Sequence, residues 1–297
     1  MPNKPKIIVV LGPTASGKSD LAVDLARQFN GEIISADSRQ VYRGMDIGSG
    51  KITKKEMKGV PHYLLDVADP KRRFSAGQFK KLGEAAIQKI LIKNKLPIIC
   101  GGTGFYIQAL VDNISLPEVK PDLKLRAQLE KLTTRELFEK LKKLDPSRAQ
   151  KIDANNRRRL IRAIEIAWLT KKPVAPLKAQ PEFEDLKIGV KKSSEELEEL
   201  IRRRLLKRLK KGMIKEVENL RQSGVSWKRL ESLGLEYRWI ARYLQNKISY
   251  KEMAIRLQKD IEHFAKRQMT WFKRDQQIKW ITKYGEAEKL TKNFLKK

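Results

Sequence analysis

The stretch that decides the fold is IIVVLGPTASGKS, residues 7–19. Its first five residues are apolar and mostly β-branched, which is typical of a strand buried on both faces of a parallel sheet. The next eight fit the pattern G-x-x-x-x-G-K-S/T, in which backbone N–H groups, a lysine and a helix start bind phosphate oxygens. We expect this loop to hold a di- or triphosphate, with Ser19 as a ligand of Mg²⁺. The loop consists of Gly12, Pro13, Thr14, Ala15, Ser16, Gly17, Lys18 and Ser19.

Strand and helix patterns alternate after this loop. Strands are predicted at 32–36, 62–67 and 96–100, and helices at 18–29 and 76–92. The alternation favours a doubly wound parallel α/β sheet of the P-loop NTPase-like kind. A further strand is predicted at 186–190, followed by helices at 194–222, 236–245 and 249–274. The last helix carries one apolar stripe that we interpret as core, formed by Met253, Leu257, Ile261, Phe264 and Trp271.

The pattern changes after about residue 112. Residues 120–171 contain no good strand and show charged helical patterns, interrupted at Asp145-Pro146 and at Lys172-Pro173. We therefore predict two parts. Residues 1–112 and 185–297 form an α/β core with C-terminal helices, and 113–184 form an α-helical insertion.

The composition points to a polyanionic partner. Lys and Arg number 65 against 35 Asp and Glu, a formal net charge of +30. A surplus of this size opposes compaction by self-repulsion, and nucleic acid is the partner that explains it, although charge does not separate DNA from RNA.

Cysteine and apolar content indicate a cytoplasmic protein without a membrane segment. Cys100 is the single cysteine, so neither an intrachain disulfide nor a zinc cluster with the two histidines is expected. We predict a buried, inert thiol. The apolar run from Ile7 to Leu11 is too short for a signal peptide or a membrane span.

Asp37 directly follows the second predicted strand. In a doubly wound sheet this position lies at the same carboxyl edge as the phosphate loop, where ligands bind. A carboxylate there has three roles that position alone leaves open: a helix N-cap, a metal partner in a nucleotide hydrolase, or a general base.

Five motifs occur in an order that resembles the tRNA dimethylallyltransferase family, also called the tRNA isopentenyltransferase family. The similarity runs from about residue 6 to about residue 282. The motifs are GPTASGKS at 12–19, DSRQVYRGMDIG at 37–48, GGTGFY at 101–106, NNRRRLIRAIE at 155–165 and AKRQMTWF at 265–272.

The resemblance implies an activity and a set of catalytic residues. Members transfer a dimethylallyl group from dimethylallyl diphosphate to the N6 amine of the adenosine adjacent to the anticodon. By similarity, Asp37 is the general base and Thr103 lies beside the reacting centre. Lys18 and Arg204 bind the diphosphate, with Mg²⁺ as cofactor. We expect a monomer that binds the tRNA anticodon stem-loop.

The same resemblance predicts the tRNA contacts. Asp37 and Thr103 face the target base, and their neighbours Ser38, Arg39 and Gln40 read base edges. Other residues grip the stem from two sides: Arg126, Asn155, Arg157, Arg158 and Arg159 in the insertion, and Lys266 and Arg267 in the C-terminal part.

Four positions depart from the family pattern. Asn156 replaces a usual Asp, Ile261 and Glu262 replace a usual Thr-Arg pair, and Leu200 replaces a usual Arg. These changes concern the grip on tRNA more than the chemistry. Two alternatives remain: a small-molecule kinase with the same loop, which predicts ATP turnover, and a non-catalytic RNA-binding nucleotide switch.

Overall fold

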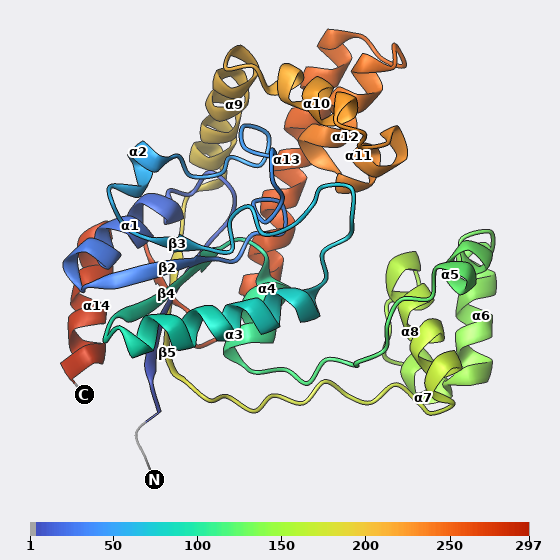
Figure 1. The fold of residues 1–297 in the computed structure, drawn as a ribbon, viewed down its shortest axis with the longest axis horizontal. Coiled ribbons are helices and arrows are strands. Elements are labelled where there is room, and N and C mark those ends of the chain that lie inside the picture. Colours follow the sequence, from blue (N-terminus) through green and yellow to red (C-terminus); the bar gives the residue numbers. More distant parts are fainter. Residues whose placement is uncertain (1–3, 297) are drawn as a thin grey trace. The chain divides into compact units, whose positions relative to one another are not determined.

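A parallel sheet lies at the centre of the larger of the two compact units of the chain (Figure 1). The computed structural model describes residues 4–296. Within them six strands follow the order β3-β2-β4-β1-β5-β6, and every pairing is parallel. The predicted parallel α/β fold is therefore confirmed. The strands are β1 (Lys6–Leu11), β2 (Gly31–Ser35), β3 (His62–Tyr63), β4 (Leu96–Gly101), β5 (Glu184–Val190) and β6 (Lys279–Ile281).

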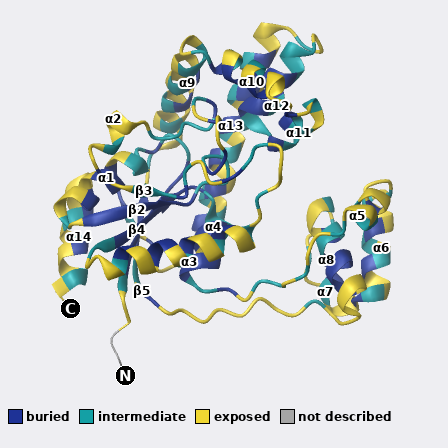
Figure 2. Cartoon of the chain, in the orientation of Figure 1, coloured by how far each residue is buried: buried dark blue, intermediate teal, exposed yellow. Residues whose placement is uncertain are grey.

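Helices cover both faces of the sheet. The side chains of Ile8 and Val10 pack on one face with α1 (Lys18–Gln28) and α14 (Tyr284–Lys296). Those of Ile7 and Val9 pack on the other with α3 (Ala76–Ile92) and α4 (Gly104–Val111). Because β1 is buried on both faces, its sequence is apolar without alternation. Figure 2 shows the buried strands and the exposed outer sides of the helices.

Helices of the C-terminal part form a separate core with the segment after β2. The helices are α9 (Ser194–Lys210), α10 (Met213–Gln222), α11 (Trp227–Leu233), α12 (Leu235–Leu244) and α13 (Tyr250–Phe272). Val41, Tyr42 and Met45 pack against α10 and α12, and Met253 and Leu257 of α13 complete the cluster. The stripe predicted for the last long helix is thus largely core.

Some element predictions were wrong. The continuous helix at 194–222 breaks into α9 and α10, since Gly212 adopts a left-handed φ of 98°. The strand at 62–67 ends at Tyr63, because Leu64 and Asp66 have positive φ values that leave the extended region. Five elements were missed: α4, α11, β6, α14 and the short helix α2 (Lys54–Met57).

Residues Ile114–Gln180 form a compact helical unit of their own. Leu137, Leu141, Leu160 and Ile164 are at its centre, each fully buried. The predicted insertion, 113–184, spans this unit. Its helices are α5 (Leu123–Leu129), α6 (Thr134–Leu144), α7 (Pro146–Ala149) and α8 (Arg157–Thr170).

Among residues 4–296, no helix is both long enough and apolar enough to span a lipid bilayer.

Cys100 in β4 is buried, and burial raises the pKa of its thiol to about 11. The predicted burial of this thiol is confirmed, and its inertness stays a prediction.

Candidate functional site

Three loops meet at the carboxyl edge of the sheet because β2, β4 and β1 are neighbours in it (Figure 1). The phosphate loop follows β1, the segment 36–53 follows β2, and the glycine-rich turn 102–103 follows β4. The backbone N–H of Ala36 donates to the Cys100 carbonyl at 2.7 Å, and that of Thr103 donates to the Ala36 carbonyl at 3.2 Å. The strand order therefore brings Asp37, Thr103 and the phosphate loop to one place.

The phosphate loop is tied to the turn after β4 by one buried side chain, Gln268 of α13. Its Oε1 accepts from the Thr14 backbone N–H at 2.8 Å, and its Nε2 donates to the Gly102 carbonyl at 2.8 Å. Inside the loop, the Ser16 hydroxyl is buried and has no hydrogen-bond partner among the described residues. An unpaired buried hydroxyl is costly, and a phosphate oxygen would satisfy it.

Two cations beside the loop carry unneutralised charge. The Lys18 ammonium donates to the Pro13 carbonyl at 3.1 Å, and the Arg204 guanidinium contacts the Thr14 hydroxyl at 3.5 Å. Within residues 4–296 neither side chain forms an ion pair with an acid. Burial lowers the pKa of Lys18, and burial together with nearby Arg208 lowers the pKa of Arg204 to about 10. Arg204 therefore stays charged at neutral pH, and the site favours an anion.

Asp37 uses one carboxylate oxygen to cap its own loop. Oδ1 accepts from the backbone N–H groups of Arg39 at 2.7 Å and Gln40 at 3.2 Å. In the described part of the chain, Oδ2 makes no hydrogen bond. The Thr103 hydroxyl accepts from the Ser38 N–H at 3.0 Å, which links the turn after β4 to the same loop. The arrangement leaves one carboxylate oxygen available as a proton acceptor.

Side chains expected to read the target base are engaged within the protein. The Arg39 Nε donates to the Leu233 carbonyl at 2.8 Å. Gln40 accepts from the Ser35 hydroxyl at 3.0 Å and donates to the Gly50 carbonyl at 3.2 Å. Their contacts with tRNA stay a prediction.

On α13, Lys266 and Arg267 are exposed. The Nζ atom of Lys266 lies 3.5 Å from Oε1 of Glu198. The departures from the family pattern in α13 have structural roles here. Ile261 is buried in the C-terminal core, and Glu262 accepts from Gln258 at 2.9 Å.

In the helical unit, Arg126 forms a bidentate pair with Glu165, with both distances at 2.7 Å. Glu165 is fully buried, so this pair ties α5 to α8. Asn156 caps α8 by accepting from the Arg159 N–H at 3.2 Å, a role that Asn and Asp fill equally well. Asn155, Arg158 and Arg159 are exposed, and Arg157 contacts Thr134 and the Glu130 carbonyl.

The bridging role of Gln268 was not predicted, although the residue lies within the motif at 265–272. A signal was present: buried positions 261, 265, 268 and 272 share one helical face, and Gln268 is the polar residue on that face. A polar side chain on a core face needs buried partners. The C-terminal Tyr284 was also missed; its hydroxyl donates to the Gly17 carbonyl at 2.7 Å.

The fold and site define a phosphate-loop α/β protein in which two cations, Lys18 and Arg204, lie beside the loop and a carboxylate, Asp37, lies at the same sheet edge. A family model described as IPP transferase matches residues 40–275. The chain belongs to this IPP transferase family.

Known proteins resemble the chain over nearly its full length. The tRNA dimethylallyltransferase of Thermoanaerobacter sp. is 40% identical, with 98% of this chain and 96% of that protein covered. The protein of the same name from Acetivibrio thermocellus is 41% identical, with 97% and 96% covered.

Solved structures agree with these relatives. The tRNA isopentenylpyrophosphate transferase from Bacillus halodurans has a TM-score of 0.74 at 35% identity, covering 98% of this chain and 96% of that one. A eukaryotic dimethylallyltransferase acting on tRNA has a TM-score of 0.76 at 27% identity, covering 90% and 70%.

Proposed function

We propose that this chain transfers a dimethylallyl group from dimethylallyl diphosphate to the N6 amine of the adenosine adjacent to the anticodon of tRNA. One observation carries the proposal. At one edge of the sheet, the Asp37 carboxylate lies near an anion-binding site whose cations, Lys18 and Arg204, form no ion pair with an acid in the described part of the chain. Support also comes from relatives named tRNA dimethylallyltransferase that are about 40% identical over nearly the whole chain.

The anion site would stabilise the leaving group. When the bond between the allylic carbon and the diphosphate oxygen breaks, its electron pair leaves with the diphosphate. Lys18, Arg204 and the N–H groups of the loop offset the negative charge that develops there. Preorganised donors of this kind act without reorganising as the bond breaks, and in a kinase the same groups would stabilise a phosphoryl transfer instead.

Asp37 would act on the nucleophile. The adenine N6 lone pair is delocalised into the ring, so the amine attacks poorly while it keeps both protons. Asp37 accepts one of them as the bond between N6 and the allylic carbon forms, which contributes roughly 10²–10⁴-fold for a general base. Thr103, linked to the same loop, orients the amine or bonds the diphosphate.

The residues present fit a Mg²⁺ ion that arrives with the diphosphate. No group of three or more His, Cys, Asp or Glu side chains in the described part of the chain could hold a metal alone. Mg²⁺ commonly keeps waters and uses substrate phosphates with few protein ligands, so the Ser19 hydroxyl suffices on the protein side. When bound, the ion would add positive charge against the departing diphosphate.

The target base must leave its stack to reach this edge, because an adenine stacked inside a folded loop is inaccessible to the half-buried Asp37 carboxylate. Ser38, Arg39 and Gln40 lie next to Asp37 and would contact the extruded base. We propose that the protein works as a monomer in the cytoplasm. The proposed grip on the stem comes from Arg126, Asn155, Arg157, Arg158, Arg159, Lys266 and Arg267.

A transfer assay tests the proposal. The protein is incubated with undermodified tRNA, Mg²⁺ and dimethylallyl diphosphate labelled in the allyl group, and digested nucleosides are separated. We expect label on adenosine. A parallel reaction with γ-labelled ATP is the control for a kinase. Phosphate transfer from ATP, with no allyl label on tRNA, would replace the proposal.

A further inference from the structure

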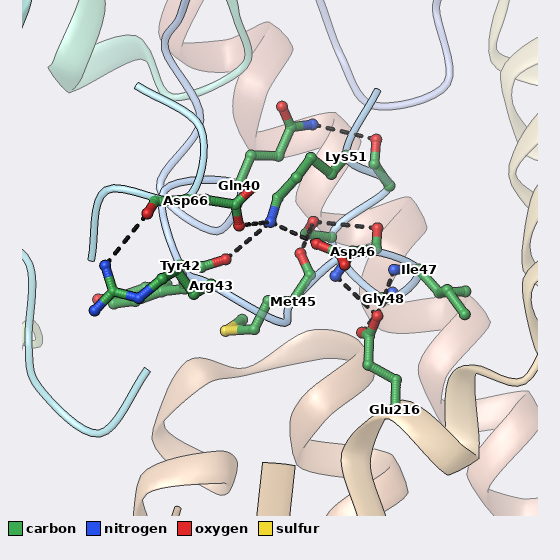
Figure 3. Close-up of polar contacts among 12 residues, drawn as sticks. Gln40, Tyr42, Arg43, Met45, Asp46, Ile47, Gly48, Lys51, Asp66 and Glu216 are labelled. Atoms are coloured by element: carbon green, nitrogen blue, oxygen red, sulfur yellow. Dashed lines mark hydrogen bonds and ion pairs between the residues drawn. The ribbon is translucent and has the colours of Figure 1, made fainter. Parts of the chain in front are cut away.

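A buried carboxylate far from Asp37 in sequence holds the segment after β2 in place. Glu216 of α10 accepts hydrogen bonds from three consecutive backbone N–H groups (Figure 3). Those of Asp46 and Ile47 donate to Oε2 at 2.8 and 2.6 Å, and that of Gly48 donates to Oε1 at 3.0 Å. Successive N–H groups of this kind make a concavity for an anion, and here the anion is the protein's own side chain.

The Glu216 carboxylate also accepts a hydrogen bond from a neighbouring helix. The Tyr237 hydroxyl of α12 donates to Oε1 of Glu216 at 3.0 Å, and both side chains are buried. Gly48 fits closely against this pair, since a Cβ there would lie 2.9 Å from the Tyr237 hydroxyl. Four donors and no cation surround the carboxylate among the described residues, so hydrogen bonds alone balance its charge.

The segment held in this way reaches the diphosphate site through its carbonyl groups. We call residues 46–50 the clamp loop. The Gly48 carbonyl accepts from Arg208 at 3.3 Å, and the Gly50 carbonyl accepts from Arg204 at 3.5 Å. Gly50 packs directly on both guanidinium groups, because a Cβ there would lie 1.5 Å from Arg208 and 2.3 Å from Arg204. The position of the clamp loop therefore sets where these two cations lie.

The solvent side of the same loop is fixed separately. The Lys51 ammonium donates to the Tyr42 carbonyl at 2.9 Å and pairs with Asp46 at 2.6 Å and Asp66 at 2.5 Å (Figure 3). Lys51 holds the loop to its neighbours along the chain, whereas Glu216 holds it to α10. The helix that precedes α10 in the chain is α9, which carries Arg204 and Arg208. The Glu216 contacts thus join the loop to α10, next to the contacts that its carbonyl groups make with Arg204 and Arg208 of α9.

We propose that Glu216 is a positioning residue for the diphosphate. It fixes the clamp loop on α10, and the loop carbonyls then hold Arg204 and Arg208 against the phosphate loop. The inference rests on the proposed function, because it assigns the diphosphate to that cradle. It adds a residue on a distant helix that touches neither substrate.

The Glu216→Gln variant tests this role because it keeps the shape of the side chain and replaces one acceptor oxygen with an NH₂ donor. That donor faces N–H groups or the Tyr237 hydroxyl, so at least one contact is lost. We expect the Kd for inorganic diphosphate with Mg²⁺, measured by titration calorimetry, to rise about tenfold. The KM for dimethylallyl diphosphate should rise in parallel, with the Kd for tRNA within about twofold of wild type.

Glu32→Gln is the matched control. Glu32 is also a buried carboxylate, but it lies near the amino end of β2, opposite the site. It should lower the melting temperature while leaving the diphosphate Kd unchanged. Tyr237→Phe removes one donor without adding one, and should raise the diphosphate Kd two- to threefold even if Glu216→Gln fails to fold.

The outcomes separate the inference from the proposed function. Unchanged diphosphate affinity in both Glu216→Gln and Tyr237→Phe overturns the positioning role. So does a loss of affinity for diphosphate and tRNA alike in Glu216→Gln. If wild type transfers no allyl group yet both variants weaken diphosphate binding, the proposed function fails and the positioning role stands.

Discussion

The carboxylate of Asp37 divides its two oxygens between structure and chemistry. Oδ1 accepts two backbone N–H groups of its own loop, whereas Oδ2 has no hydrogen-bond partner in residues 4–296. A substitution that removes the whole side chain therefore mixes loss of a cap with loss of a base. Asparagine separates the two effects, because its side-chain oxygen can keep the cap while its amide cannot take a proton.

We predict that Asp37→Asn lowers the rate of allyl transfer by roughly 10²–10⁴-fold, the usual contribution of a general base. The Kd for tRNA should stay close to that of wild type. Asp37→Ala should abolish transfer and still bind tRNA. Single-turnover rates with saturating enzyme, together with tRNA binding isotherms, measure both quantities. Transfer by Asp37→Asn near the wild-type rate would remove Asp37 as the base.

Motif residues and bridging residues differed in how well they could be predicted. Lys18 and Asp37 could be proposed from the sequence because each follows a strand end at a position fixed by a local pattern. Gln268 acts through partners that lie 166 and 254 residues away along the chain. The backbone groups that Glu216 binds lie 168 to 170 residues away. Such pairings depend on how distant elements pack, which local spacing does not encode.

At the scale of elements, the break between α9 and α10 depends on one residue. Gly212 has φ 98° and ψ 27°, and a Cβ there would meet no atom within 4 Å. A side chain at position 212 would therefore destabilise the protein through the left-handed backbone conformation, and not through clashes with neighbouring atoms. The break turns α10 so that Glu216 can reach the clamp loop.

We predict that Gly212→Ala lowers the free energy of unfolding by about 1–2 kcal/mol, the cost of a left-handed conformation for an L-residue. Denaturant titration measures the change. Gly285→Ala is the control: Gly285 lies in α14, also has no atom within 4 Å of a Cβ, and has no left-handed φ. Its substitution should be neutral or slightly stabilising. Equal effects of the two variants would contradict the argument.

An acid at the other end of β2 contributes to stability in a pH-dependent way. Burial alone would raise the pKa of Glu32, but hydrogen bonds from Lys95, Tyr63 and Lys93 outweigh it and lower the pKa to about 2. The Glu32 side chain is 1% exposed. A lowered pKa means that the folded state favours the ionised form, so this stabilisation is present above the unfolded value of 4.5 and disappears as pH falls towards 2.

We predict that Glu32→Gln lowers the free energy of unfolding by about 3–4 kcal/mol at pH 7, since the pKa falls from 4.5 to about 2 and one pKa unit corresponds to about 1.4 kcal/mol. The difference from wild type should shrink between about pH 5 and pH 2, following the shift in pKa. Urea titrations at several pH values measure it. A difference that is constant over this pH interval would show that the ion pairs are not its source.

Long elements with a clear period were predicted well, and short or exposed ones were not. Helix α3 was predicted as 76–92, the observed bounds. Strand β6 has three residues, too few for a period, and it forms only because β5 offers a free edge. The Gly212 break escaped prediction because the apolar pattern continues on both sides of it.

At the scale of the whole molecule, the charge surplus exceeds what the proposed diphosphate site requires. Lys18, Arg204 and Arg208 are cations at that site, and the Arg208 guanidinium is already paired with a carboxylate oxygen of Glu236 at 3.2 Å. The net charge of the chain is +30. Most of the surplus therefore lies outside the proposed site, where it can attract a polyanion from a distance.

We predict that tRNA affinity falls steeply with salt, because each phosphate neutralised by a lysine or arginine releases counterions. With six or more contacts, the Kd should rise by roughly 10³-fold or more between about 50 and 200 mM salt. Fluorescence titrations at several salt concentrations yield the slope of log Kd against log salt. Inorganic diphosphate bound to the same protein is the control, and its slope should be smaller because it occupies only the cradle. A tRNA slope no steeper than the diphosphate slope would mean that the surplus charge serves some purpose other than holding the RNA backbone.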